Sequence, residues 1–354
     1  MSERVRRVGV ADLGRRGLVG VVAVGAVLAL AVAGLVAPGS AAGTLSQVLF
    51  DSGTLASALR LSVPIALAAL GGIFAEKSGV INIGLEGLLI ISAFSAVYAM
   101  DLIDSLWVAF GAGVLASTVL AGLFAVVCIE FRADQIIAGL AIWLIALGLA
   151  PFLATVYYGS VNSGSVSTLG TWTIPGLAAI PYLGTVFRSG PSVYLLLIAV
   201  PLVWWVLNRT AFGRHIRASG ENPRALDTAG VSVRRVRYQG ILLSGVLSGI
   251  GGASLSLSLG QFVGTGQTMV NGKGFIAIVA YLFGNYNPVG AFGASLLFAG
   301  LEAIQLRLQQ VPGYAVPDSL IQTIPYLTVI IVLALVGRTR LPEAAGENYE
   351  SGED

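Results

Sequence analysis

Apolar blocks of about 20 residues follow one another along almost the whole chain, and this repetition restricts the possible folds more than any other feature. A helix needs about 20 apolar residues to cross the hydrocarbon core of a bilayer. Of the 354 residues, 56% are hydrophobic and only 11% are charged, whereas a soluble domain carries about 25% charged residues. The sequence therefore predicts an all-α polytopic integral membrane protein with about ten transmembrane helices. The predicted spans lie near residues 18–37, 55–74, 81–100, 106–129, 135–157, 192–208, 238–259, 274–286, 288–308 and 319–337.

Two of these blocks allow a second interpretation. Arginines precede the block at 18–37, as in a signal peptide, but the block exceeds the about 7–15 residues of a signal-peptide apolar region, so we expect an uncleaved span. The block at 274–286 is short and flanked by glycines. A broken or re-entrant segment is tolerated where it is buried or lines a cavity, so the sequence leaves open whether this block spans the membrane.

Residues 209–237 form a basic island between long apolar blocks, with seven arginines against two acidic residues, Glu221 and Asp227. Positive charge concentrates on the cytoplasmic side of membrane proteins. With both termini in the cytoplasm, all but four of the 20 basic residues fall on that side. The charge bias therefore predicts an even number of spans in a plasma-membrane protein. The predicted organisation is a cytoplasmic N-terminus (1–17), a transmembrane domain (18–337) that contains the loop 209–237, and an acidic, disordered cytoplasmic tail (338–354).

The stretch EKSGVINIGLEG, residues 76–87, combines acidic, amide and glycine residues at the start of the third predicted span. Asn82 and Glu86 are four residues apart, so in a helix they would share one face. An ionisable residue at membrane depth is a candidate functional residue. The alternative is that Glu86 lies at the cytoplasmic interface and only ties two helices together.

Two further charged residues, Arg60 and Glu302, lie at similar predicted depths from the outer ends of their spans. Because an unpaired charge at this depth costs several kcal/mol, we expect them to form an ion pair, which could be purely structural. Gln305 lies one turn from Glu302 and would share its helix face.

Four stretches of the chain together resemble the permease subunits of ATP-binding-cassette (ABC) importers, in the nucleoside and simple-sugar branch. The resemblance extends over about residues 55–337, and the form of the first stretch is closest to nucleoside (guanosine, purine) members. The stretches are EKSGVINIGLEG (76–87), DQIIAGLAIWLIALGL (134–149), FGRHIRASGENPRALDTAGV (212–231) and GKGFIAIVAYLFGNYNPVGA (272–291).

This resemblance implies a pair of permeases of about ten spans each, identical or not, that bind two cytoplasmic ABC ATPase subunits. It also implies that an extracytoplasmic solute-binding protein or lipoprotein delivers the solute. The loop that carries ASGENPRALDTAGV resembles the coupling element that sits in a cleft of the ATPase. The matching positions here are Gly220, Glu221, Asn222, Ala225, Ala229 and Gly230.

The residues of the loop themselves predict a short helix. Asn222-Pro223 favours a helix start, with Pro223 at the first helical position. Residues 223–229 are enough for about two turns, and Gly230 can end the helix in a left-handed conformation. Without the resemblance, a solvated basic loop would be the simpler interpretation.

The chain contains no GxxxxGK[ST] phosphate-binding loop, so ATP and Mg²⁺ are expected on a separate subunit and no cofactor on this one. A single cysteine, Cys128, and a single histidine, His215, leave little from which to build a metal site or a catalytic dyad. We therefore expect a transport subunit rather than an enzyme, with membrane lipid and protein partners and no nucleic acid.

A nucleoside has a flat base and a hydroxylated sugar, which aromatic faces and amide groups would suit. The candidate residues of a solute path are Asn82, Glu86, Trp143, Asn271, Phe275, Glu302 and Gln305. Such aromatic side chains are also common in protein cores and at lipid-facing surfaces. The alternative function is an ion-coupled secondary transporter or channel that uses intramembrane carboxylates such as Glu86 and Glu302.

Overall fold

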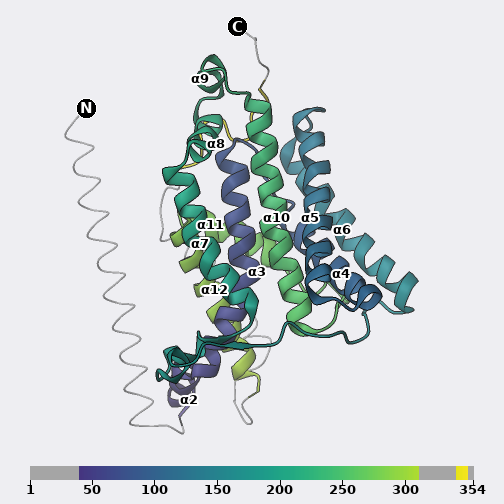
Figure 1. The fold of residues 1–354 in the computed structure, drawn as a ribbon, viewed down its shortest axis with the longest axis vertical. Helices are drawn as coiled ribbons and strands as arrows, with labels where there is room; N and C mark the ends of the chain where they lie inside the picture. Colours follow the sequence, from purple (N-terminus) through teal and green to yellow (C-terminus); the bar gives the residue numbers. More distant parts are fainter. Residues whose placement is uncertain (1–39, 311–339, 350–354) are drawn as a thin grey trace, which may run out of the picture.

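The computed structural model describes residues 40–310 and 340–349, and this part of the chain is mostly helical (Figure 1). Among the described residues, seven helices are long and apolar enough to cross a membrane, which confirms the predicted all-α membrane protein. The predicted spans 18–37 and 319–337 lie outside the described residues, so a total of ten stays a prediction. The seven helices are α3 (Ser52–Lys77), α4 (Leu85–Ile103), α5 (Leu106–Ile129), α6 (Gln135–Tyr158), α7 (Pro191–Arg209), α10 (Val233–Leu259) and α12 (Pro288–Leu308).

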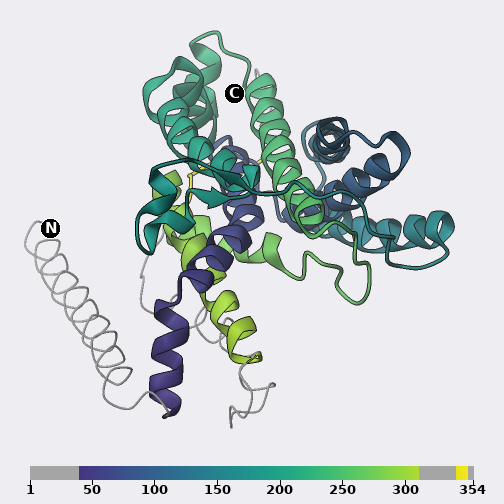
Figure 2. The same ribbon diagram turned by 60° about the horizontal axis from the view of Figure 1, so that its bottom comes forward.

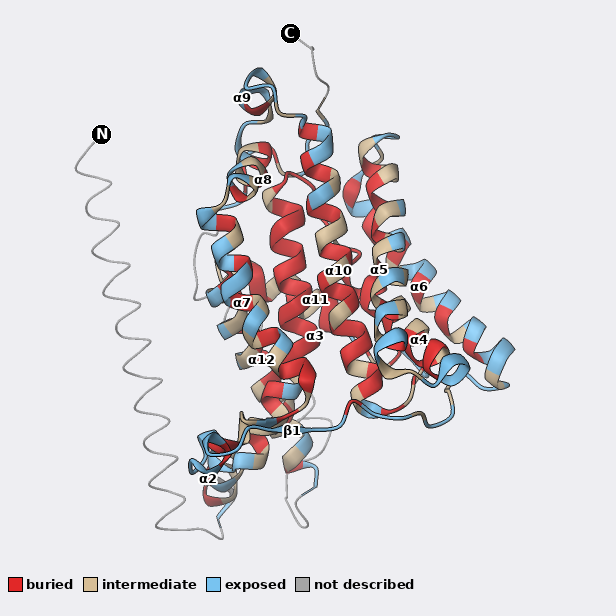
Figure 3. Ribbon diagram, viewed as in Figure 1, coloured by how far each residue is buried: buried red, intermediate tan, exposed pale blue. Residues whose placement is uncertain are grey.

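Helices α3 and α10 form the centre of the bundle, and both are buried along most of their length (Figure 3). Small residues allow this close packing. A Cβ on Gly71 of α3 would lie 2.9 Å from the backbone oxygen of Ser244 on α10, so the two backbones are almost in contact. Small residues at helix interfaces have this effect in membrane proteins generally.

The outer helices expose large apolar side chains over much of their surface. On α6, Ile137 and Val156 are each 68% exposed, and this helix leans away from the rest of the bundle (Figures 1 and 2). Exposed apolar surface of this extent marks contact with lipid or with another protein. The periphery is thus suited to a bilayer and to a partner subunit.

One segment of the bundle is broken. After α10 ends at Leu259, residues 260–272 return into the bundle without forming a helix, and α11 (Lys273–Phe283) begins inside it. Its 11 residues extend about 16 Å, roughly half the thickness of the hydrocarbon core. The structure therefore resolves the ambiguity of the predicted block 274–286 in favour of a broken segment, with one non-helical half and one helical half.

The basic island folds into two short helices, α8 (Ala211–Glu221) and α9 (Pro223–Thr228), at one end of the bundle, which we call the basic end (Figure 1). The side chain of Asn222 accepts a hydrogen bond from the Ala225 N–H at 3.0 Å and caps α9. Pro223 occupies the first turn, and Gly230 has a φ of 79° directly after the helix. The short helix predicted over residues 223–229 is confirmed.

The opposite end of the bundle carries α2 (Ala41–Phe50) and the long connection between α6 and α7. That connection contains a two-residue antiparallel pair, β1 (Trp172–Thr173) and β2 (Arg188–Ser189), and the 3₁₀ turns η1 (Leu177–Ala179) and η2 (Leu183–Thr185). The N–H of Val166 donates to the oxygen of Gly260 at 2.8 Å. The connection therefore lies against the non-helical residues that lead into α11.

The tail at residues 340–349 is not disordered as its composition predicts. It packs onto the basic end, where the Ala344 N–H donates to the oxygen of Gly220 at 2.8 Å and the Gly346 N–H donates to the oxygen of Gly79 at 3.1 Å. Ala344 is 4% exposed. The prediction failed because specific backbone partners, rather than composition, hold this segment.

Candidate functional site

The EKSGVINIGLEG stretch does not continue one helix but joins two. Helix α3 ends at Lys77 and α4 begins at Leu85, so Asn82 precedes the helix and the predicted shared face with Glu86 is wrong. The amide oxygen of Asn82 accepts from the Gly84 N–H at 3.0 Å, and its amide nitrogen donates to the Ser244 hydroxyl at 3.0 Å. Local hydrogen bonding of this kind competes with helix formation and here fixes the turn against α10.

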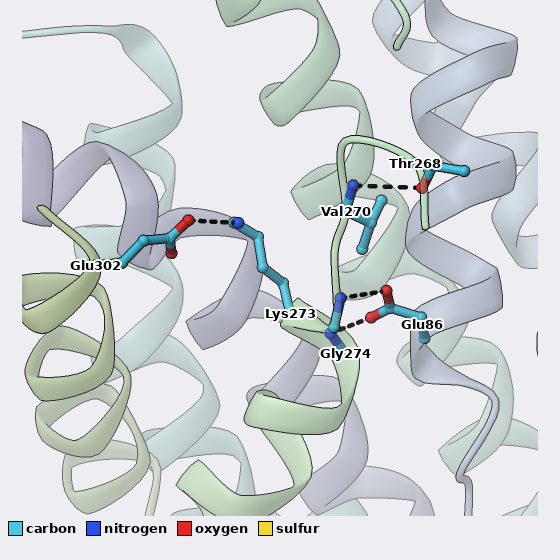
Figure 4. A network of polar contacts seen from close by, with 7 residues as sticks. Glu86, Thr268, Val270, Lys273, Gly274 and Glu302 are labelled. Carbon is cyan, nitrogen blue, oxygen red and sulfur yellow. Dashed lines mark hydrogen bonds and ion pairs between the residues drawn. The ribbon is translucent and has the colours of Figure 1, made fainter. Parts of the chain in front are cut away.

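Glu86 lies in the first turn of α4 and holds the start of α11 (Figure 4). Its carboxylate accepts hydrogen bonds from the Gly272 N–H at 2.7 Å and from the Gly274 N–H at 2.6 Å. These amides belong to the N-terminus of a helix, where the first N–H groups lack helical partners and the helix dipole favours an anion. Glu86 is 1% exposed, so it ties two segments together inside the bundle rather than at an interface.

Glycine at position 274 permits this contact. A Cβ built on Gly274 would lie 2.5 Å from the Glu86 Cα and closer still to its backbone nitrogen. Side chains do not approach a backbone so closely, so any other residue would push α11 away from α4. The helix start and the carboxylate therefore require a residue without a side chain at this point.

Glu302 on α12 pairs with Lys273, the first residue of α11, and not with Arg60. The Lys273 Nζ lies 2.8 Å from the Glu302 carboxylate (Figure 4). Arg60 is exposed on α3, so the predicted Arg60–Glu302 pair is wrong. The predicted span began after Lys273, which left this residue in a flanking loop. In the structure the broken segment brings the ammonium group of Lys273 into the bundle, where it is almost fully buried and requires an anion.

The other end of α11 is held by a second buried carboxylate. Glu76, one residue before the end of α3, accepts hydrogen bonds from the hydroxyls of Tyr281 and Tyr286, the latter at 2.5 Å. Tyr281 lies in α11 and Tyr286 in the turn that follows it. Glu76 is 5% exposed. Two carboxylates of one sequence stretch, Glu76 and Glu86, therefore hold opposite ends of α11.

The predicted aromatic pair also meets at the start of α11. The rings of Trp143 on α6 and Phe275 on α11 are 5.2 Å apart at 83°, an edge-to-face contact. Asn271 is exposed just before α11 with a φ of 47°, and Gln305 is half-buried on α12, one turn beyond Glu302. The structure thus gathers Glu86, Lys273, Trp143 and Phe275 around one helix start, and the part that each plays in a solute path stays a prediction.

The basic loop is joined directly to the EKSGVINIGLEG stretch. The Ser219 hydroxyl of α8 donates to the oxygen of Ser78 at 2.7 Å. A Cβ on Gly220 would lie 2.5 Å from the oxygen of Lys77, so α8 packs on the end of α3. Gly220 is buried in this contact. The other predicted coupling positions (Glu221, Asn222, Ala225, Ala229 and Gly230) are exposed.

A polar contact outside the spans links α5 to the start of α10. Glu130, just after α5, accepts hydrogen bonds from the Tyr238 hydroxyl and from Arg234, each at 2.7 Å. These hydrogen bonds from Tyr238 and Arg234 hold the pKa of the exposed Glu130 carboxyl below its usual value. The contact fixes the beginning of α10 relative to its neighbour.

Sequence reasoning missed several polar groups that the structure places inside the bundle. Glu76 was part of a recognised stretch, but nothing local to it indicates two tyrosines more than 200 residues away as partners. The hydroxyls of Ser248 and Ser254 on α10 are buried without a hydrogen-bond partner among the described residues. The alternation of serine and glycine along α10 is the signal that could have indicated a polar, closely packed helix.

Apolar helices packed around buried polar groups, with a folded basic loop at one end, define a multi-pass membrane protein. The family described as "Branched-chain amino acid transport system / permease component" matches residues 54–335, which is most of the chain. The chain belongs to this family. It is therefore a plasma-membrane transport component and not an enzyme.

Three relatives are similar to the chain over almost their whole length. The nucleoside ABC transporter permease protein NupC of Lactococcus lactis subsp. cremoris is 37% identical over 306 residues, which cover 83% of this chain and 96% of the relative. The guanosine ABC transporter permease protein NupQ of Bacillus subtilis is 36% identical, with coverages of 82% and 94%. A putative glucose ABC transporter permease protein of Haloferax volcanii is 32% identical, with coverages of 80% and 92%. No solved structure matches the chain.

Proposed function

We propose that the chain is the transmembrane subunit of an ATP-driven ABC importer that carries a nucleoside or a related sugar-containing solute. The names of the nucleoside, guanosine and glucose permeases that match it almost end to end support this solute class. The chain would contribute the passage, while ATP and Mg²⁺ bind to the partner ATPase. Solute would cross by alternating access, in which the passage opens to one side of the membrane at a time.

The observation that carries the proposal is an unbroken series of contacts from the basic loop to the interior. Helix α8 binds the turn after α3 through Ser219 and Ser78. The same stretch then holds both ends of α11 through Glu76 and Glu86. A displacement of the loop therefore acts on a helix in the middle of the bundle without passing through a flexible link. This is the mechanical connection that an importer driven from outside the bundle requires.

The passage would run beside the start of α11. There the rings of Trp143 and Phe275 offer apolar faces for a base or sugar ring, and the exposed Asn271 offers an amide group, while Asn82 fixes the turn beside them. The proposed path comprises Asn82, Glu86, Trp143, Asn271, Phe275, Glu302 and Gln305. Glu86 and Glu302 position the passage rather than bind a coupling ion, because each carboxylate already has a partner within the bundle.

The basic end would face the cytoplasm, as its arginines favour, with both termini of the chain on that side. The exposed positions of α9 would lie in the ATPase, and a second permease, identical or not, would complete the passage. An extracytoplasmic solute-binding protein or lipoprotein would deliver solute to the opposite end of the bundle.

The test is uptake by the reconstituted transporter. Proteoliposomes that contain the permease, its ATPase and its binding protein should accumulate labelled guanosine. They should do so only when ATP is present on the side of the membrane where the ATPase is bound. An uncoupler should leave uptake unchanged. Accumulation that persists with an inactive ATPase and collapses with the uncoupler would establish the ion-coupled alternative instead.

A matched pair of substitutions tests the role of α9. Ala225→Arg places a long charged side chain on the exposed face of α9, and we expect at least a tenfold loss of ATPase binding and of uptake. Ala211→Arg makes the same change at an exposed position of α8 that is not among the coupling positions, and it should retain both. Equal effects of the two substitutions would show that α9 is not the docking helix.

A further inference from the structure

An acidic hollow of about 410 Å³ lies beside α9 within the otherwise basic end of the molecule. We call it the acidic notch. It contains three carboxylates, those of Glu221, Glu343 and Glu347, against one guanidinium group, that of Arg224. Its full lining is Glu221, Asn222, Pro223, Arg224, Glu343, Ala344, Glu347, Asn348 and Tyr349. The start of α9 forms one wall of the notch and the tail forms the other.

Backbone hydrogen bonds hold the tail in this position, together with hydrogen bonds from the side chains of Arg237 and Tyr349. Besides the bonds of Ala344 and Gly346 to the loop and to the turn after α3, the oxygen of Glu347 accepts from the buried Arg237 at 2.7 Å. The Tyr349 hydroxyl donates to the carboxylate of Asp227 in α9 at 3.0 Å. The tail is therefore a fixed part of the surface on which α9 lies.

The carboxylates of the notch form no close salt bridge within the described part of the chain, although Glu221 interacts electrostatically with Lys77 and Glu347 with Arg237. Among residues 40–310 and 340–349, no ion pair involves Glu221, Glu343 or Glu347, and all three side chains are exposed. A neighbouring hollow of about 440 Å³ has the opposite charge: it is lined by Lys77, Arg214, Arg217 and Arg340 among others, and it shares Glu221 with the acidic notch. Two adjacent hollows of opposite sign favour one orientation of a partner with complementary charges.

We propose that residues 341–349 and α9 form a single docking surface for the ATPase subunit, and that the acidic notch receives basic side chains of that subunit. The inference rests on the proposed function, because it takes α9 as the element that the ATPase contacts. It adds a second binding element from the far end of the chain, 110 or more residues away. Charge pairs at the rim of an interface act mainly on association rate and orientation, so the tail sets how the ATPase seats on α9.

The test measures binding of the ATPase subunit to the permease in lipid nanodiscs. The double variant Glu343→Gln, Glu347→Gln removes two exposed charges without altering the backbone bonds of the tail. We expect about a tenfold increase in Kd at 50 mM salt and a smaller increase at 300 mM salt, because salt screens exposed charges. The matched control ends the chain after Tyr349. It removes three acidic residues beyond the notch (Glu350, Glu353 and Asp354), and its Kd should change less than twofold.

Three outcomes would overturn the inference. The double variant could bind as the wild type does, or the control truncation could weaken binding equally, in which case only total charge matters. Alternatively, a truncation after Arg340 could bind the ATPase more tightly, which would make the tail a block rather than a docking element. The Ala225→Arg variant distinguishes this failure from failure of the proposed function, because it should weaken ATPase binding at least tenfold whenever α9 docks the ATPase, whatever the tail does.

Discussion

Replacing Glu302 by glutamine is the most direct test of how polar groups are arranged inside the bundle. The substitution keeps the size of the side chain and removes the charge that faces Lys273. The Lys273 side chain is 6% exposed and that of Glu302 is 24% exposed. The variant therefore leaves a buried ammonium group without an anion, whereas Lys273→Met leaves a carboxylate that is only partly buried.

Because the two side chains differ in exposure, the two single substitutions should lower the free energy of unfolding by different amounts. Removing one partner of a fully buried pair costs about 3–5 kcal/mol, and we expect about 3 kcal/mol for Glu302→Gln because the remaining charge is the more buried one. Lys273→Met should cost less, about 2 kcal/mol, because the carboxylate that remains is 24% exposed although it lies at membrane depth. The double variant Glu302→Leu, Lys273→Met should be close to the wild type, because it removes both charges.

The assay is thermal unfolding of the purified permease in detergent, followed by tryptophan fluorescence. At about 2–4 °C per kcal/mol, Glu302→Gln should lower the Tm by about 6–12 °C. Arg60→Gln is the control and should change the Tm by less than about 2 °C, as surface substitutions usually do. The reasoning is refuted if Arg60→Gln matches Glu302→Gln, or if the double variant is no more stable than Glu302→Gln.

Three further predictions concern the contacts around α11 and α10. Gly274→Ala should lower stability by about 1–3 kcal/mol and reduce guanosine uptake, because its Cβ would displace α11 from Glu86; full activity in the transport assay would contradict the contact. Tyr281→Phe removes one donor to the buried Glu76 carboxylate and should lower the free energy of unfolding by about 1–3 kcal/mol, whereas an unchanged detergent denaturation curve would argue against the bond. Because the pKa of Glu130 is lowered from 4.5 in the folded protein, its contribution to stability is complete above about pH 4.5 and is lost as the pH falls below it. Glu130→Gln should therefore flatten the fall of Tm below pH 4.5, and parallel Tm curves for the two proteins would disprove this.

The lengths and positions of the apolar blocks were enough to predict the long helices of the fold. All seven long helices begin within five residues of a predicted boundary, since apolar length is a strong signal in membrane proteins. The third span nevertheless begins at Leu85 rather than near residue 81, which leaves Asn82 outside the helix. Asn82 bonds to the backbone of Gly84, and this local choice between a turn and a helix is not encoded in hydropathy.

The contacts of the site depend on where a broken segment places its residues in depth, and this could not be read from the sequence. Lys273 looked like a loop residue because it stands among glycines. In the structure it begins a helix inside the bundle and pairs with Glu302. Similarly, the acidic composition of the tail predicts disorder, but Ala344 and Gly346 contribute backbone N–H groups that composition does not reveal. Sequence reasoning selected the stretches that meet around α11, and tertiary pairing decided the partners within them.

The way in which α11 is held limits how the basic loop can act on the interior. Glu76 and Glu86 are ten residues apart in sequence and hold the two ends of a helix about 16 Å long, so α11 cannot tilt without moving the stretch between them. That stretch includes Ser78, whose backbone oxygen receives the hydroxyl of Ser219 in α8. Since packed elements have discrete arrangements rather than bending continuously, a shift of about 1–2 Å at the loop is enough to move such an element between two positions. The contact of Phe275 with Trp143 at the start of α11 is then the point at which a displacement that begins outside the bundle would change the shape of the passage.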